Sequence, residues 1–286
     1  MRKPVIVPIF FLIAGSILCV AGVGLFCHMA LARHPRKSTA PRGAETVTAR
    51  APDGELLSAW WMRATAQNGN CVAVLHGIAD SRASAVGFGP MFLSEGYSVL
   101  VPDSRAHGES GGEFVTYGLL EKYDVIAWAD WMKRAGCRKL FGLGESLGAS
   151  VLIESAGVRP VFTAIVAECP YADLREVAAY RVQQIGHVPA FLARLIVKSA
   201  MVYARRVDGL DLGHVSPVES MARTATPILL IHGLLDTRTP PYNSERLAGV
   251  NPRASLWLVP NADHTGASTA QPNEFRKRVL GWFAEH

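Results

Sequence analysis

One serine in this chain lies between two glycines at the junction of two contrasting patterns. Ser146 lies in the sequence GESLG, which follows a short apolar stretch and precedes a helical pattern at 147–157. A sharp turn from strand to helix strains its apex residue, and flanking glycines leave room for the chain to fold back. The alternative is a plain turn whose serine caps the helix. The pattern favours a nucleophilic serine at the end of a strand.

A serine hydroxyl is a poor nucleophile near neutral pH, so it needs a base and an acid that orients the base. His264 lies in the sequence PNADHTG, in a loop between an apolar stretch and the last helical pattern. Asp236 follows another apolar stretch in LIHGLLDTRTP. Asp263 is less suitable, because a carboxylate rarely reaches the ring of its neighbour in the correct geometry. We predict a catalytic triad of Ser146, Asp236 and His264.

The oxyanion formed by attack on a carbonyl needs hydrogen-bond donors that are already in place. The backbone N–H of Leu147, directly after the serine, is one candidate. The second is the backbone N–H of Ile78, in the loop after an apolar stretch, where Gly77 would let the backbone approach the substrate. An ordinary loop glycine is the alternative. The other histidines near strand ends are expected to have structural roles; they are His76, His107 and His232.

Apolar stretches and helical patterns alternate along the part of the chain that must position these residues. Fully apolar strands that alternate with helices indicate a parallel sheet covered on both faces, with sites at the carboxyl ends of its strands. A hairpin pattern at 45–64 precedes them, which gives eight strands, the first two antiparallel. The other strands are expected at 71–77, 97–103, 139–146, 162–170, 227–233 and 255–261, and the helices at 83–95, 119–136, 147–157 and 273–285.

A long insertion separates two of the predicted core strands. Residues 170–225 are too many for a simple connection, and we expect them to fold as a small helical cap. Within the insertion, 188–206 has apolar residues at helical spacing and a basic end. Its apolar face either packs on the core or forms a wall that faces an acyl chain or lipid. The sequence leaves both possibilities open.

The N-terminal region differs in composition from the rest of the chain. Residues 4–32 carry no Asp, Glu, Lys or Arg, so they could span the roughly 30 Å hydrocarbon layer as a helix. We predict a transmembrane anchor over 1–32; the alternative is a cleaved signal peptide, for which this apolar run is long. The segment 33–43 reads as a linker, and the catalytic domain is expected to cover 44–286. Removing 1–40 should therefore remove no element of the core.

The charge of the chain is concentrated at this end. Six of the 29 basic residues and none of the 24 acidic residues lie in 1–44, so the remainder is almost neutral. A nucleic-acid partner is not supported, because the basic residues flank an apolar span. They are better suited to lipid headgroups. Basic residues on both sides of the span leave its orientation open, and we expect the catalytic domain outside the cytoplasm.

The five cysteines do not indicate a cofactor or a cross-linked scaffold. Two of them, Cys19 and Cys27, lie in the apolar span. The other three, Cys71, Cys137 and Cys169, are an odd number without C-x-x-C spacing. Neither a disulfide framework nor a zinc site is predicted. We expect no metal and no cofactor.

Several of these motifs together resemble a known family. From about residue 44 to the end, the chain is similar to α/β-hydrolase fold serine hydrolases, in the bacterial branch that includes serine aminopeptidase and lysophospholipase-like sequences. The resemblance implies the triad in the order Ser146, Asp236, His264, and it does not specify a substrate. The sequence HGIAD stands where lipases carry HGGG, so the geometry of the oxyanion loop is less constrained. The motifs are LHGIADSR, VPDSRAHGES, GLGESLGAS, LIHGLLDTRTP and PNADHTG.

Three functions are compatible with these patterns. The leading prediction is a membrane-anchored serine hydrolase that cleaves a carboxylic ester or thioester through an acyl-enzyme. A serine aminopeptidase or amidase is the alternative enzyme; it would often carry an acidic patch for the substrate amine, and Glu145 and Glu168 lie near the site in sequence. The third possibility is a membrane-tethered hydrolase-like module that binds without catalysis.

Overall fold

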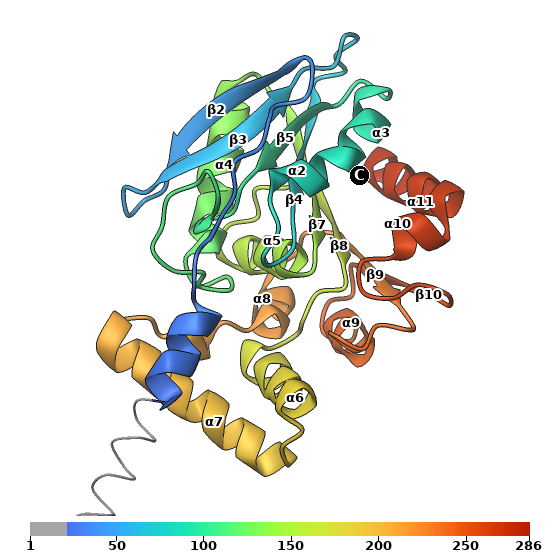
Figure 1. Ribbon diagram of the computed structural model, residues 1–286. Helices are drawn as coiled ribbons and strands as arrows, with labels where there is room; N and C mark the ends of the chain where they lie inside the picture. The colour runs from blue at the N-terminus through green and yellow to red at the C-terminus, as the bar shows by residue number, and fades with distance from the viewer. Residues whose placement is uncertain (1–21) are drawn as a thin grey trace, which may run out of the picture.

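An eight-stranded, mostly parallel sheet forms the centre of the protein (Figure 1). The computed structural model describes residues 22–286. Along the sheet the strands lie in the order β10-β9-β8-β7-β4-β5-β3-β2, and only β3 runs antiparallel to its neighbours. The strands are β2 (Ala44–Arg50), β3 (Leu56–Met62), β4 (Asn70–Leu75), β5 (Ser98–Pro102), β7 (Lys139–Glu145), β8 (Ala164–Glu168), β9 (Ile228–Gly233) and β10 (Ala254–Val259). The predicted α/β-hydrolase sheet of eight strands is confirmed.

Helices cover both faces of the sheet. One face carries α4 (Glu121–Arg134), α5 (Leu147–Val158), α8 (Pro217–Arg223) and α9 (Tyr242–Ala248). The other carries α2 (Arg82–Ala85), α3 (Gly89–Leu93), α10 (Ala267–Ala270) and α11 (Pro272–Glu285). The single helix expected at 83–95 is instead interrupted by a 3₁₀ turn, Val86–Phe88, because two glycines and a proline at 87, 89 and 90 disfavour a continuous α-helix.

The strand β4 shows how the apolar pattern builds two cores. Successive side chains of a strand point to opposite faces of the sheet. Cys71, Ala73 and Leu75 therefore belong to the apolar cluster under α4 and α5, whereas Val72 and Val74 belong to the cluster under α11. All five side chains are buried. This two-sided burial suits a strand in the middle of the sheet, where helices cover both faces.

The insertion between β8 and β9 folds as a helical cap. It contains α6 (Leu174–Gly186), α7 (Ala190–Tyr203), a π-helical turn (Ala204–Asp208), a 3₁₀ turn (Leu212–His214) and α8. The helices α6 and α7 pack against each other below the carboxyl edge of the sheet in the view of Figure 1. The cap begins close to the predicted position, because the chain leaves β8 at Glu168.

The N-terminal region lies partly outside the described residues. Of the anchor predicted over 1–32, the structure describes 22–32, which is helical over 22–30 and packs beside α7 (Figure 1). Cys27 and Leu31 are each only 2% exposed and belong to the larger apolar cluster. No helix within 22–286 combines the length and the apolar character that crossing a membrane requires.

The segment that was expected to be a free linker is attached to the domain. The strand β1 (His34–Pro35) pairs in parallel with β6 (His107–Gly108), so this part of 33–43 is fixed in place. The backbone N–H of His34 donates to the carbonyl of Ala106 at 2.7 Å. Sequence patterns missed β1 because two residues are too short to show alternation. Removal of 1–40 would therefore remove packed core residues, contrary to the expectation from sequence.

One disulfide corrects the prediction from the cysteine spacing. Cys71 at the start of β4 is bonded to Cys137, just before β7, across 66 residues of sequence, with Cα atoms 5.8 Å apart. The neighbouring strands β4 and β7 bring the two residues together, because the register pairs Cys71 with Leu140. Spacing along the chain could not reveal this pairing, which depends on the order of strands in the sheet. Among the described residues, Cys27 and Cys169 are free thiols.

Candidate active site

Three predicted residues converge at the carboxyl edge of the sheet. Ser146 follows β7, Asp236 follows β9, and His264 follows β10. The Nε2 atom of His264 lies 2.9 Å from the Oγ of Ser146, and its Nδ1 lies 2.7 Å from Oδ2 of Asp236. The imidazole therefore connects the hydroxyl to the carboxylate. This linkage is the arrangement that activates a serine for attack.

The backbone at Ser146 is strained in the way that a nucleophilic elbow requires. Its φ of 52° and ψ of −111° are unfavourable for a residue with a side chain. The two flanking glycines make this turn possible. A Cβ at Gly144 would lie 2.6 Å from backbone atoms of Gly148, and a Cβ at Gly148 would lie 2.6 Å from the carbonyl oxygen of Leu75. The turn therefore holds the serine hydroxyl above the sheet, at the N-terminus of α5.

The carboxylate of Asp236 is fixed on both of its oxygens. Oδ1 accepts hydrogen bonds from the backbone N–H groups of Arg238 and Thr239, at 2.8 and 2.9 Å. Oδ2 faces both His264 and His232. Burial alone would raise the pKa of this carboxyl, but the hydrogen bonds from the two histidines outweigh it and hold the pKa well below its ordinary value. Asp236 is therefore a permanent anion beside His264.

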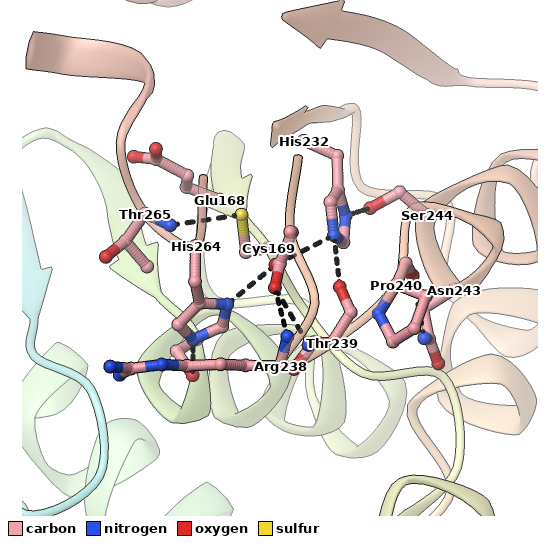
Figure 2. A network of polar contacts seen from close by, with 12 residues as sticks. Glu168, Cys169, His232, Arg238, Thr239, Pro240, Asn243, Ser244, His264 and Thr265 are labelled. Atoms are coloured by element: carbon pink, nitrogen blue, oxygen red, sulfur yellow. Dashed lines mark hydrogen bonds and ion pairs between the residues drawn. The ribbon is translucent and has the colours of Figure 1, made fainter. Parts of the chain in front are cut away.

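The histidine at the end of β9 positions this carboxylate. The ring of His232 is fully buried. Its Nδ1 lies 2.6 Å from Oγ of Ser244, and its Nε2 lies 2.7 Å from the carbonyl oxygen of Thr239. Dashed lines in Figure 2 mark both contacts. Cys169, His232 and Asp236 lie close enough together to hold a metal ion. Asp236 already belongs to the triad, however, and the polar atoms of Cys169 and His232 support the triad. We therefore assign these three residues to the triad and its support rather than to a metal site.

The loop after β4 brings the second predicted oxyanion donor to the serine. A Cβ built on Gly77 would lie 3.5 Å from Cβ of Ser146. Across the described residues, the backbone N–H groups of Ile78 and Leu147 donate to no protein acceptor, and both residues line the cavity at the serine. The next N–H, that of Ala79, donates to Nε2 of His107 at 3.2 Å. The loop is therefore held so that the N–H of Ile78 stays free for a ligand, as does the N–H of Leu147 at the start of α5.

Two carboxyl groups near the serine do not line the cavity; Glu168 is buried and Glu145 is half-buried. Glu145 and Glu168 are paired across β7 and β8, and Oε1 of Glu168 accepts a hydrogen bond from the N–H of Ala267 at 2.9 Å. Burial raises the pKa of Glu145 to about 7 and that of Glu168 to about 8. Neither side chain lines the cavity that opens at Ser146. The carboxyl group of Glu168 therefore links the end of β8 to the start of α10.

An apolar cavity of about 640 Å³ opens at Ser146 and His264. Its size lies within the range of small-molecule sites. The walls come from the cap helices α6 and α7, from the loops that carry the triad, and from the N-terminal helical segment. Arg181 and Arg238 are the charged side chains among the lining residues. The apolar wall residues include Leu174, Val177, Val182, Ile185, Ile196, Val197, Ala200, Met201 and Leu212.

The sequence did not reveal the residues that close this cavity. The sequence left open whether the cap packs on the core or forms a wall, and in the structure α6 and α7 both line the cavity. Phe26, Cys27, Ala30 and Leu31 form a further part of the wall, although their stretch was predicted to lie in a membrane anchor. Their spacing is that of one helical face, a signal that the uniformly apolar composition around them conceals.

Comparisons with known proteins agree with this geometry. The family model of the prolyl oligopeptidase family matches residues 85–286. YqkD of Bacillus subtilis, an uncharacterized protein, is 30% identical over 216 residues, which are 73% of this chain and 70% of that protein. The esterase Pf2001 of Pyrococcus furiosus superimposes with a TM-score of 0.71 and 26% identity, over 89% of this chain and 98% of the esterase.

A peptidase shares the same fold at lower sequence identity. The acylaminoacyl peptidase of Pyrococcus horikoshii superimposes with a TM-score of 0.63 and 16% identity, over 84% of this chain and 41% of the peptidase. The fold is therefore common to an esterase and a peptidase and does not choose between ester and peptide substrates. The elbow at the end of β7, the buried carboxylate and the family match lead to one conclusion: the chain belongs to the prolyl oligopeptidase family and is a serine hydrolase of the α/β-hydrolase class.

Proposed function

We propose that the protein cleaves carboxylic esters or thioesters through an acyl-enzyme on Ser146, with His264 as base and Asp236 as its orienting acid. The observation that carries this proposal is the apolar cavity that opens directly at the serine and the histidine. An acyl chain would fill such a cavity, because burial of apolar surface is favourable by roughly 25 cal/mol per Å². The backbone N–H groups of Ile78 and Leu147 would stabilise the oxyanion.

The proposed reaction has two half-reactions. Oγ of Ser146 attacks the acyl carbon while its proton passes to Nε2 of His264, at 2.9 Å. The bond between the acyl carbon and the leaving oxygen or sulfur then breaks, and His264 returns the proton to the leaving group. A water molecule gives a proton to His264 and attacks the acyl-enzyme, which releases the carboxylic acid and regenerates Ser146. Asp236 stabilises the imidazolium in both steps and is not itself protonated.

The lining of the cavity favours an ester over a substrate with a free amine. A serine aminopeptidase often carries a carboxylate near the serine that binds the substrate amine. No Asp or Glu is among the described residues that line the cavity, and its two charged side chains are Arg181 and Arg238. Glu145 and Glu168, the carboxylates that sequence placed nearby, do not line the cavity, and burial raises the pKa of both. An aminopeptidase or amidase is therefore the second candidate.

A panel of substrates tests the proposal. p-Nitrophenyl esters of increasing acyl length are assayed beside aminoacyl p-nitroanilides with the purified protein. We expect turnover of the esters, with a preference for acyl chains longer than acetyl, and little turnover of the anilides. Preferential cleavage of the anilides would replace the esterase proposal with the peptidase alternative.

Reaction with a fluorophosphonate probe separates both enzymes from a module that only binds. Such probes label serines whose hydroxyl is activated by a neighbouring base. The short contact between His264 and Ser146 supports labelling. We expect one labelled site, which mass spectrometry of the digested protein should identify as Ser146. An unlabelled, folded protein would favour a non-catalytic binding role.

The location of the domain is part of the proposal. Disulfides persist mainly in oxidising compartments outside the cytoplasm. The bond between Cys71 and Cys137 therefore supports our expectation of an extracytoplasmic catalytic domain. Thiol labelling in intact cells followed by peptide mapping tests this expectation. Protection of Cys71 and Cys137 without reductant supports it, and free thiols at both positions would place the domain in the cytoplasm.

A further inference from the structure

We propose that the N-terminal segment 22–35 is part of the substrate site, and that the helical segment 22–30 limits the length of the acyl chain that the enzyme accepts. This inference rests on the proposed esterase function for its consequence in catalysis. Its structural basis is independent of catalysis, because it concerns which residues close the cavity. The segment lies more than a hundred residues from the nucleophile in sequence and yet forms a wall of the same cavity.

One face of the helical segment is turned to the cavity and the other is exposed. Phe26, Cys27, Ala30 and Leu31 line the cavity. Residues at positions i and i+4 share a face of an α-helix, so the pairs 26/30 and 27/31 form one stripe. Leu25 and Met29, also four residues apart, are 63% and 68% exposed and do not line the cavity. The two faces provide matched positions for substitution.

The helical segment is held against the cap by close packing. The buried thiol of Cys27 lies 3.6 Å from the carbonyl oxygen of Ala200 in α7, 173 residues away in sequence. A Cβ added at Gly24 would lie 3.1 Å from the ring of Tyr203. Ala200 itself lines the cavity. The segment and α7 therefore form a continuous wall rather than two separate elements.

The end of the segment is tied to the loop that precedes α4. The hydroxyl of Tyr117 donates to the carbonyl of Ala30 at 2.6 Å, and the N–H of Val115 donates to the carbonyl of Leu31 at 3.0 Å. Tyr117 also lines the cavity. These two bonds fix the position of Ala30 relative to the active site, so a larger side chain at this position would project into space that substrate occupies.

The strand β1 connects the same segment to the oxyanion loop. The ring of His34 lies 5.1 Å from the ring of His107, and the two strands β1 and β6 pair at these residues. His107 in turn accepts the hydrogen bond from Ala79, next to the proposed donor Ile78. Asp80 in this loop also pairs with Arg36 at 3.7 Å. The segment therefore contacts both the acyl wall and the support of the oxyanion loop.

Two pairs of single substitutions in the full-length protein test the wall. Ala30→Phe adds a ring on the cavity face, and Met29→Phe adds the same ring on the exposed face as its control. Phe26→Ala removes a ring from the cavity wall, and Leu25→Ala truncates the exposed face. The readout is kcat/KM for p-nitrophenyl esters of two to sixteen carbons, normalised to the sites labelled by a fluorophosphonate probe.

The expected result is a change of chain-length preference confined to the cavity face. Each methylene that binds in an apolar site is worth about fourfold. Ala30→Phe should therefore lower kcat/KM for the long esters by about tenfold or more relative to the acetyl ester, whereas Met29→Phe leaves the profile unchanged. Phe26→Ala should move the optimum to longer chains, and Leu25→Ala should not. Identical profiles in both members of each pair would overturn the inference.

A binding measurement keeps this result distinct from the fate of the proposed function. Dansyl-undecanoate, a fluorescent fatty acid, is titrated into Ser146→Ala protein with and without the Ala30→Phe and Met29→Phe changes. Weaker binding with Ala30→Phe alone supports the wall even if no ester is hydrolysed. Equal binding in all three proteins would contradict it, even if the wild-type protein is an active esterase.

Discussion

The catalytic edge of the sheet and the wall of the cavity are built in opposite ways. At the edge, the turns that carry two of the residues are local: Asp236 accepts hydrogen bonds from the backbone two and three residues ahead, and Ser146 has a glycine two residues away on either side. In the wall, Cys27 meets Ala200 across 173 residues, and apolar contacts predominate. The chemistry is encoded locally, whereas the shape of the cavity is assembled from distant segments.

This difference separates two kinds of sensitivity to substitution. A triad bonded at 2.7 and 2.9 Å loses its function when a single atom is removed. An apolar wall tolerates changes of shape, and each change alters which substrates fit. We therefore expect substitutions at the edge to affect all substrates equally. Substitutions in the wall should affect substrates according to their size.

The largest effect is expected for Ser146→Ala. Loss of the nucleophile should lower kcat by about 10⁵-fold for every ester in the panel, because the members of a triad act as one unit. His264→Ala should match it within error. Folding should be unaffected, as measured by circular dichroism and thermal melting, because the substitution removes only a half-buried hydroxyl whose hydrogen-bond partner is His264. A folded Ser146→Ala protein with more than a few per cent of wild-type activity would remove this residue from the mechanism.

Asp236→Asn tests the second part of the catalytic edge. An amide in place of the carboxylate no longer stabilises the imidazolium, and we expect kcat to fall by about 10³- to 10⁴-fold for all chain lengths. The control is Asp263→Asn, next to His264 in sequence but exposed in the structure. It should retain activity within about threefold. Equal losses in both variants would show that the carboxylate has been misassigned.

The contrast between edge and wall also explains what could be predicted from sequence. The strand before Ser146 and the loops with Asp236 and His264 carry local patterns, and parallel strands bring their carboxyl ends to one edge. The predicted sheet was confirmed for this reason. The disulfide between Cys71 and Cys137 depends on the order of strands in the sheet, so it was not predicted. The strand β1 was not predicted either, because it has only two residues. Because residues 4–32 are apolar throughout, the sequence did not indicate which of them line the cavity.

Truncation measures how far the wall belongs to the folded domain. Two proteins are compared, one without residues 1–21 and one without 1–40. The longer deletion removes Cys27 and Leu31 from the core and β1 from its pairing with β6. Because a buried Leu side chain contributes about 2 kcal/mol, we expect the longer deletion to lower the free energy of unfolding by about 3–5 kcal/mol relative to the shorter one.

Denaturant unfolding and the ester panel provide the measurements for these truncations. The ratio of activity on long esters to activity on short ones should rise in the longer deletion, since the triad is retained and the wall that limits the acyl chain is lost. The shorter deletion removes none of the described residues and serves as the control. Equal stability and equal chain-length profiles in the two proteins would mean that 22–40 is dispensable, as the sequence alone had suggested.

The smallest effect is expected on the pH dependence of stability, through His107, which lies between the N-terminal segment and the oxyanion loop. Burial, together with the nearby His76, lowers the pKa of His107 to about 4. Its Nδ1 lies 2.9 Å from the carbonyl oxygen of Arg105 and acts as donor there, so Nε2 is the acceptor for the N–H of Ala79. Protonation would place a hydrogen on Nε2 and oppose this bond. The folded protein therefore contains the neutral ring.

The sign of the resulting pH dependence follows from this pKa. Between the ordinary value of 6.5 and about 4, the unfolded chain takes up a proton that the folded protein excludes. The stabilisation is complete above pH 6.5 and is lost as the pH falls towards 4, by at most about 3 kcal/mol.

In His107→Gln the amide oxygen can still accept from Ala79, but this titration is absent. We expect the variant to lose less unfolding free energy than the wild type between pH 7 and pH 4.5, as measured by urea denaturation. The other titrating groups, including His76, Glu145 and Glu168, are common to both proteins and cancel in the difference. An unchanged dependence on pH would show that His107 does not couple the N-terminal strand to the oxyanion loop through a neutral ring.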